Sequence, residues 1–200
     1  MKTIKESFEK EIVIQKSRFI GIIRPLKSKE DVKIVLADIQ KKYPKATHYC
    51  YGYIFEGAQK SNDDGEPSGT AGRPILETMI RNDLFNCIIV VVRYFGGIKL
   101  GAGGLLRAYI DSSVSVINES ELFEEEERKI YEAIVSYEHN EVLKNYLIKN
   151  QIDILDTFYD DKIKYLLSSN IDFESDLCDY MQGKISLSFI ENKKILVKVN

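Results

Sequence analysis

The sequence is short of several residue types, and each shortage excludes a class of protein. Its 200 residues include no tryptophan, four prolines, two histidines and three cysteines. The cysteines, Cys50, Cys87 and Cys178, are far apart and form no CxxC pair. So few dispersed ligands do not build a structural zinc site, and an odd number of separated thiols is typical of a reducing compartment. We therefore expect reduced cysteines, no metal and no cofactor.

Long apolar runs are also missing. No stretch approaches the roughly 20 apolar residues that a membrane helix needs, and residues 1–6 lack the apolar core of a signal peptide. With 44% hydrophobic residues and little proline, the composition is that of a folded globular chain. The sequence therefore predicts a cytoplasmic protein without a membrane segment.

Charge is unevenly divided along the chain, although the net charge is only −3. Residues 1–120 hold 18 Lys and Arg against 14 Asp and Glu, a net of +4, whereas residues 121–200 hold 10 against 17, a net of −7. Contacts to phosphate-rich partners rely on Lys and Arg. If the chain binds RNA, we expect the first part to do so.

Two domains are predicted, separated by the acidic run at residues 124–127. A run of like charges between two well-patterned regions is typical of a solvated connector. We expect one domain at residues 1–123 and a second at 128–200, which together make an α+β protein.

The first domain shows strands and helices in mixed order. Six consecutive apolar residues at 87–92 are typical of a central strand that is covered on both faces. The other expected elements are one or two strands at 12–25, a helix at 29–42, a strand at 48–55, a polar loop at 57–72, a helix from Pro74 and a helix at 105–118. The helix from Pro74 includes Leu76, Met79 and Ile80, and the last helix has an apolar side made of Leu106, Ile110, Val114 and Ile117.

The second domain has a simpler pattern. It predicts, in order, a strand at 130–137, a helix at 141–149, strands at 152–158 and 162–167, a helix at 173–181 and a strand at 184–189. This β-α-β-β-α-β order is that of the ferredoxin-like fold. Residues 191–199 are expected to add an edge strand.

The most informative segment is 93–107, in which five glycines fall within nine residues, directly after the apolar strand and at the start of a helix. Free N–H groups without obstructing Cβ atoms, at a helix N-terminus, form a geometry that binds phosphate. The segment matches neither the P-loop nor the dinucleotide fingerprint. Two interpretations are open: an anion site between Arg93 and Arg107, or glycines that serve close packing. The candidate residues are Arg93, Tyr94, Gly96, Gly97, Gly101, Gly103, Gly104 and Arg107.

A second loop, at residues 61–72, combines turn-forming residues with acids and hydroxyls just before a predicted helix. Such side chains can cap the helix, or they can face the glycine-rich segment as part of a binding site. Arg93 ends an apolar strand, where its charge needs a partner. The candidate residues in this loop are Ser61, Asp63, Asp64, Glu66 and Thr70, and the three acids are the expected partners of Arg93.

The strand at 48–55 carries two further features. His48 is a candidate general base, with a purely structural role as the alternative. Cys50 lies on the same face, about 7 Å away by strand rise, which is too far for direct activation. On the other face, four alternate aromatic residues form either a base-stacking platform or, as we favour, core beneath a helix. These are Tyr49, Tyr51, Tyr53 and Phe55.

The two loops together resemble the IMPACT family, in its bacterial, YigZ-type branch. The first part of the resemblance is Ser61-x-Asp63-Asp-Gly-Glu-Pro67-x-Gly69-Thr-Ala-Gly72-x-Pro74. The second is Arg93-Tyr-Phe-Gly-Gly97-x-x-Leu100-Gly101-x-Gly-Gly-Leu105-x-Arg107-Ala-Tyr109. His48-x-Cys50 and Ser17-x-Phe19 also fit, while Gly52 and Val92 stand where alanine and threonine are common.

The resemblance implies a first domain with the fold of domain 2 of ribosomal protein S5, and a second, ferredoxin-like domain similar to one in elongation factors. Eukaryotic relatives act in translational control, largely through an extra N-terminal domain that is not in this sequence. Neither a nucleophile–base pair nor a metal cluster supports peptidase activity.

Two functions follow as hypotheses. The first is a non-catalytic regulator of translation that binds ribosome, RNA or a protein partner through the glycine-rich face, which we define as residues 61–72 and 93–107. The alternative is an enzyme or sensor that holds a phosphate or nucleotide on the same two loops, with Asp64 or Glu66 handling a proton or a metal. A purely structural role for both loops is the third interpretation.

Overall fold

The computed structural model describes residues 1–199, and the chain divides into two compact units. The first contains residues 1–124 and 197–199, and the second contains residues 125–196. Each unit has helices and a largely antiparallel sheet, so the protein is of mixed α and β structure. The boundary falls inside two long strands, β7 (Phe123–Val135) and β10 (Ile185–Lys198).

The first unit is built on a five-stranded antiparallel sheet in the order β2-β3-β6-β4-β5. These strands are β2 (Phe8–Ile14), β3 (Ser17–Pro25), β4 (His48–Phe55), β5 (Ala58–Asn62) and β6 (Cys87–Tyr94). A short strand, β1 (Lys2–Thr3), pairs with the start of β7 instead. The apolar strand β6 lies at the centre and is buried on both faces, as its sequence predicts.

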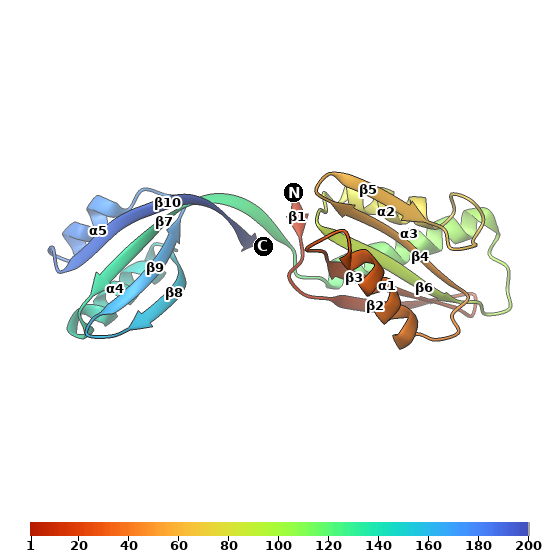
Figure 1. Cartoon of the computed structure of the whole chain (residues 1–200), viewed down its shortest axis with the longest axis horizontal. Helices are drawn as coiled ribbons and strands as arrows, with labels where there is room; N and C mark the ends of the chain where they lie inside the picture. Colours follow the sequence, from red (N-terminus) through yellow and green to blue (C-terminus); the bar gives the residue numbers. More distant parts are fainter. Residues whose placement is uncertain (200) are drawn as a thin grey trace. The chain divides into compact units, whose positions relative to one another are not determined.

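Helices cover both faces of this sheet (Figure 1). Helix α1 (Asp31–Lys42) packs on one face, and helices α2 (Gly72–Arg81) and α3 (Gly101–Glu119) pack on the other. The aromatic stripe of β4 lies on the α1 face, where Tyr49, Tyr51 and Tyr53 are half-buried beside the core and Phe55 is buried in it. The stripe is therefore core, which is the interpretation the sequence favours.

One expectation for this unit is wrong at the level of residues. The stretch 57–72 is not all loop, because β5 pairs with β4 through it. On α2, Ile75 and Met79 are buried while Ile80 is 47% exposed.

The buried face of α3 differs from its apolar side. Leu106 and Val114 are exposed, and small residues such as Ala108, Ser112 and Ser113 are buried instead. The cause is a close approach to β3: a Cβ atom on Gly21 would lie 2.6 Å from the carbonyl oxygen of Ser112. Because the helix backbone lies so near the sheet, only small side chains fit between them.

The second unit has the predicted β-α-β-β-α-β order. It continues from β7 through a 3-10 turn (Tyr137–His139) to α4 (Asn140–Lys149), β8 (Asp153–Tyr159), β9 (Ile163–Ser169), α5 (Glu174–Tyr180) and β10. Its strands lie in the order β10-β7-β9-β8. Both helices pack on one face of the sheet, with Tyr131, Leu143 and Leu177 in the shared core.

The acidic run at residues 124–127 is exposed or half-buried and lies where the boundary between the two units falls, but it is part of strand β7 and not a loop. Opposite charges make this possible. Arg128 lies 2.9 Å from the carboxylate of Glu126, and Lys194 of β10 lies 4.0 Å from that of Glu125. Repulsion within the run is thereby offset, so the segment can stay extended.

Candidate functional site

The sequence-predicted residues of the glycine-rich face meet at one end of the sheet of the first unit. Strand register explains part of this convergence, because Arg93 of β6 pairs with His48 of β4 on one side and with Phe19 of β3 on the other. Directly paired residues point to the same face of an antiparallel sheet. That face is the one covered by α2 and α3.

At the centre of the site lies a buried ion pair between Arg93 and Glu66. Arg93 Nη1 donates to Glu66 Oε1 at 2.5 Å, and the two side chains are only 6% and 3% exposed. Tyr109 of α3 donates its hydroxyl to the same oxygen at 2.8 Å. Burial raises the pKa of Tyr109, and the neighbouring Cys50 and Glu66 raise it further, so this hydroxyl stays protonated and remains a donor. Of the three acids expected to pair with Arg93, the structure selects Glu66.

Asp63 is the cap of helix α2. Its two carboxylate oxygens accept hydrogen bonds from the backbone N–H groups of Gly69, Ala71 and Gly72, at 2.9, 3.1 and 2.8 Å. A carboxylate at this position meets the free donors and the positive end of the helix dipole. The capping interpretation therefore accounts for Asp63 fully.

Asp64 and His48 organise the loop in front of the ion pair. Asp64 accepts a hydrogen bond from the backbone N–H of Tyr49 at 2.6 Å, and its carbonyl oxygen lies 2.7 Å from His48 Nδ1. A carbonyl only accepts, so Nδ1 carries the proton in this contact. His48 Nε2 lies 3.9 Å from Glu66 Oε1, which is beyond hydrogen-bond distance.

Cys50 is not an activated nucleophile. Its thiol lies 2.9 Å from the carbonyl oxygen of Asp63 and 3.4 Å from the hydroxyl of Tyr109. Burial raises the pKa of this thiol to about 12, so the thiolate is scarce at neutral pH. The His48 imidazole pairs with the carbonyl oxygen of Asp64, the residue after Asp63, and not with the Cys50 thiol. The pair acts as structure and not as a catalytic dyad.

The glycines of the segment 93–107 have different physical reasons to be glycine. A Cβ on Gly96 would lie 2.0 Å from the backbone of Lys16, so this residue serves packing against the β2–β3 turn. Gly97 and Gly101 have φ of +85° and +70°, which other residues rarely adopt. Gly103 has neither constraint, because its φ is ordinary and a Cβ would meet nothing within 4 Å. A Cβ on Gly104 would lie 3.1 Å from that of Leu100.

The remaining predicted residues lie around this centre or outside it. Thr70 is buried and donates its hydroxyl to the carbonyl of Pro67. Ser61, in β5, pairs with Gly52 of β4. Tyr94 donates its hydroxyl to the carbonyl of Pro44. Arg107 is exposed on α3, and the structure does not bring it into the pocket described next.

A pocket of about 310 Å³ opens beside the ion pair. His48, Glu66 and Arg93 line it together with the start of α3. It also contains residues outside the predicted candidates, namely Thr47, Pro67, Phe95, Lys99, Leu100, Ala102 and Leu105. Lys99 and Phe95 could have been predicted from the sequence, because both lie inside the glycine-rich segment 93–107. The structure shows that both are exposed.

Metal binding finds no support in the part of the chain that the structure describes, because no three His, Cys, Asp or Glu side chains there are placed to hold an ion. Within residues 1–199, no helix is long and apolar enough to span a membrane.

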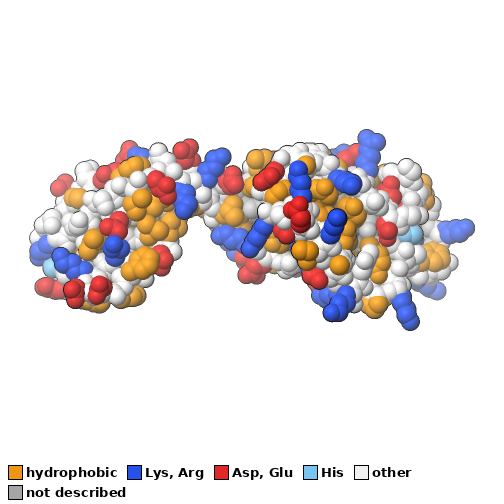
Figure 2. All heavy atoms as spheres, viewed as in Figure 1, with side chains coloured by type: hydrophobic (Ala, Val, Ile, Leu, Met, Phe, Trp, Pro, Cys, Tyr) orange, Lys and Arg blue, Asp and Glu red, His pale blue; other side chains and the backbone are white. Residues whose placement is uncertain are grey.

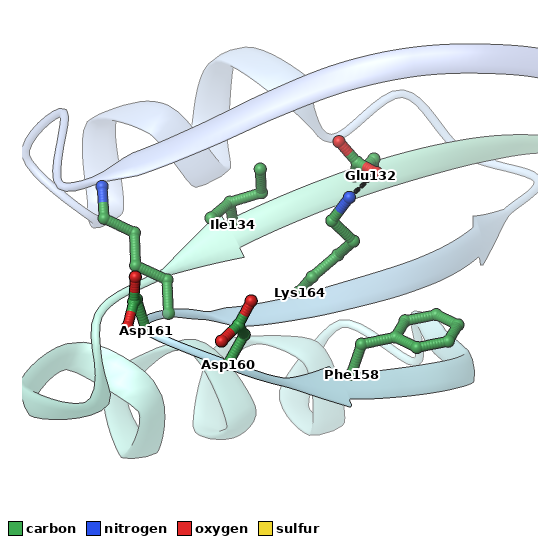
Figure 3. Close-up of a pocket in the computed structure, with 7 residues that line it drawn as sticks. Glu132, Ile134, Phe158, Asp160, Asp161 and Lys164 are labelled. Carbon is green, nitrogen blue, oxygen red and sulfur yellow. Dashed lines mark ion pairs between the residues drawn. The ribbon is translucent and has the colours of Figure 1, made fainter.

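A larger pocket, of about 740 Å³, lies on the sheet of the second unit. Figure 3 shows Phe158 and Ile134 at this surface, and Lys164 reaching the carboxylate of Glu132, 2.9 Å away. Glu132 and Ile134 alternate with core residues along β7, so this face is opposite to α4 and α5. With Asp160, Asp161 and Lys162 also lining it, acids outnumber lysines, which disfavours a phosphate-rich partner there.

Comparisons with known proteins agree on one family. The model of the Impact N-terminal domain matches residues 15–117. The IMPACT family member YvyE of Bacillus subtilis is 38% identical over 192 residues, which cover 94% of this chain and 83% of that protein. YigZ of Escherichia coli is 39% identical over 101 residues, which cover 48% of this chain and 50% of YigZ. The crystal structure of a hypothetical protein aligns over 95% of this chain and 97% of its own, with 25% identity and a TM-score of 0.59.

Proposed function

Because the chain belongs to the IMPACT family, we propose that it regulates translation without catalysing a reaction, by binding ribosome, RNA or a protein partner through its glycine-rich face. The proposal places it in the cytoplasm. We choose the glycine-rich face because of one observation, the unconstrained glycine at position 103. A glycine inside a helix costs about 1 kcal/mol relative to alanine, and neither backbone conformation nor packing requires it here. Close approach of a partner to the helix backbone supplies the missing reason.

Charge supports the same face. The segment 93–107 contains Arg93, Lys99 and Arg107 and no acidic residue. Lys99 and Arg107 are exposed, and neither forms an ion pair within residues 1–199. By comparison, Figure 2 shows Lys and Arg side chains together with Asp and Glu side chains on the side of the first unit that it presents. Free cations on a surface attract a phosphate-rich partner such as RNA.

The hydrogen bonds favour binding over catalysis. Asp63, Asp64 and Glu66 all accept hydrogen bonds from other protein groups. A general base or a metal ligand needs an accessible lone pair, and Glu66, the one acid in the pocket, is 3% exposed. The same hydrogen bonds do not oppose the phosphate-binding part of the alternative function.

We also infer finer fold assignments. For the second unit, numbering its four main strands in chain order gives the sheet order 4-1-3-2, which supports the ferredoxin-like fold. For residues 1–123 we propose the fold of domain 2 of ribosomal protein S5, and for residues 128–200 a likeness to an elongation-factor domain, both on the family resemblance.

Ribosome co-sedimentation tests the function. We expect the wild-type chain to pellet with ribosomes at low salt and less at moderate salt, and a Lys99→Ala/Arg107→Ala variant to stay in the supernatant. These residues are chosen over Arg93 because they are exposed and unpaired in the described chain, so the fold survives their loss. The matched control is Lys33→Ala/Lys41→Ala, which removes two exposed cations from α1 on the opposite face. Wild-type protein that never pellets, or pelleting that both double variants retain, would sink the ribosome-binding form of the proposal.

A further inference from the structure

We propose that the N-terminus of α3 and the adjacent pocket form a subsite for one phosphoryl group. The inference deepens the proposed function, on which it rests for its location, because it names the chemical group that the glycine-rich face recognises. The group is either a phosphate of an RNA backbone or that of a free nucleotide or small phosphate. Four observations converge on it.

The first observation is an unsatisfied donor. Arg93 lines the pocket and its side chain is 94% buried, yet its Nε atom is buried without a hydrogen-bond partner among residues 1–199. Buried donors are normally satisfied by protein or by a bound group. A guanidinium whose Nη1 already binds a carboxylate still offers further donors to an oxyanion.

The second observation is the uncapped start of a long helix. Helix α3 has 19 residues, and no side chain of its N-cap residue Leu100 caps it. Its first turn has no acidic residue either. At α2, by contrast, Asp63 of the preceding loop accepts a hydrogen bond from the N–H of Gly72. The free N–H groups and the helix dipole at Gly101 and Ala102, both of which line the pocket, therefore favour an anion.

The third observation is the open approach to these donors. Cβ atoms on Gly101 or Gly103 would meet nothing within 4 Å, so the backbone of the first helical turn is uncovered. Such a surface allows an oxyanion to contact N–H groups directly, as in other glycine-rich anion sites. Side chains at these positions would hold the anion away.

The fourth observation is the balance of charge. Lys99 lines the pocket, is exposed and has no ion pair within the described chain. Glu66 is the one acid in the lining, and its Oε1 is hydrogen-bonded by both Arg93 and Tyr109, which offset its charge. Phe95, 47% exposed at the pocket rim, offers a ring face on which a base joined to the phosphate can stack.

The test titrates the full chain with inorganic phosphate, followed by amide NMR. We expect saturable changes in the amide chemical shifts of Gly101, Ala102 and Gly103. Parallel titrations with chloride at the same ionic strength correct for the effect of salt. In the Gly103→Ala variant the affinity for phosphate that these shifts report should fall about tenfold or more. This fall corresponds to the loss of one charge-assisted hydrogen bond. Alanine fits this position and favours a helix, so the fold is retained. Asn118→Ala, near the other end of α3, is the matched control and should bind like wild type.

A second arm distinguishes the sources of phosphate. A fluorescent single-stranded oligouridylate is titrated by anisotropy at several salt concentrations. If RNA is the source, binding is saturable, phosphate competes for it, and Lys99→Ala lowers the slope of log K against log salt by about 0.7. If a small phosphate is the source, phosphate shifts the three amides while the RNA does not bind.

Absence of amide shifts at residues 101–103, or shifts that Gly103→Ala leaves unchanged, would overturn the subsite. The function proposed above fails separately. Ribosome co-sedimentation that Gly103→Ala retains and Lys99→Ala/Arg107→Ala abolishes leaves the regulator proposal intact without the phosphate subsite. Phosphate shifts with neither ribosome nor RNA binding leave the subsite intact and reject the ribosome- and RNA-binding forms of the regulator proposal.

Discussion

Arg93 Nη1 lies 2.5 Å from Glu66 Oε1, and this ion pair, formed across 27 positions of sequence, is almost fully buried. It joins the middle of the loop before α2 to the end of the central strand β6. Tyr109 ties the same carboxylate to α3. The pair therefore holds together the elements that make up the glycine-rich face, and a charge taken so far from water is costly unless its partner stays in place.

Removing one partner of this pair should destabilise the first unit strongly. We expect Glu66→Gln to lower the free energy of unfolding by about 3 to 5 kcal/mol, because it leaves a buried guanidinium uncompensated. Urea denaturation followed by circular dichroism measures the change. The double variant Glu66→Gln/Arg93→Met should recover most of the loss. Glu77→Gln, which breaks an exposed pair with Arg73, is the control and should cost about 0.5 kcal/mol or less. A cost for Glu66→Gln as small as that of the control contradicts the prediction.

Asp63 should matter more for stability than Asp64, although the two acids are adjacent. Asp63→Ala removes three hydrogen bonds from the start of α2 and should cost about 1 to 3 kcal/mol. Asp64→Ala removes one side-chain acceptor from a backbone N–H and should cost less. Hydrogen exchange at the amides of Ala71 and Gly72 reports the difference, and equal protection in both variants would show that Asp63 is not the cap.

Two glycines facing different surroundings should respond oppositely to alanine. Gly21→Ala places a methyl 2.6 Å from the carbonyl oxygen of Ser112 and must push α3 away from β3, at a cost of about 1 to 3 kcal/mol. Gly103→Ala meets no atom within 4 Å and should stabilise the chain by about 0.5 to 1 kcal/mol. Thermal unfolding of both variants measures the signs. A stabilised Gly21→Ala variant would refute the close approach of α3.

Alkaline pH should unfold the protein through its buried thiols. Burial raises the pKa of Cys87 from 9.0 to about 12, and that of Cys50 to about the same value. The unfolded chain therefore loses these protons at lower pH than the folded chain, so stability is complete below pH 9 and falls as the pH rises towards 12. The loss reaches about 4 kcal/mol per thiol at most, since each pKa unit is worth 1.36 kcal/mol.

The free energy of unfolding of wild type and Cys87→Ala, measured between pH 8 and 11, checks this expectation. The variant starts from a lower value because it leaves a cavity, but its stability should fall less steeply with pH. Identical slopes would mean that Cys87 does not contribute.

Much of the architecture could be predicted because it follows from local patterns. The alternation in residues 48–55 and the apolar run that opens β6 are visible without any neighbour, and the structure confirms both strands. Strand β5 was missed because its residues, Ala58–Asn62, are polar and lie at the sheet edge, where no burial pattern develops. That the acidic run continues a strand could not be predicted, because one of the cations that offset it, Lys194, comes from elsewhere in the chain.

The sequence by itself determined the order of the helices and of the well-patterned strands, the two loops of the glycine-rich face and the family, since these depend on periods of two and 3.6 residues and on contiguous motifs. The tertiary structure alone decided which carboxylate Arg93 binds and which face of α3 is buried. It also decided which glycines serve packing and which leave the backbone open. The physical reason is that partners and close approaches are set by strand register and by helix-to-sheet distance, and both join residues far apart in sequence.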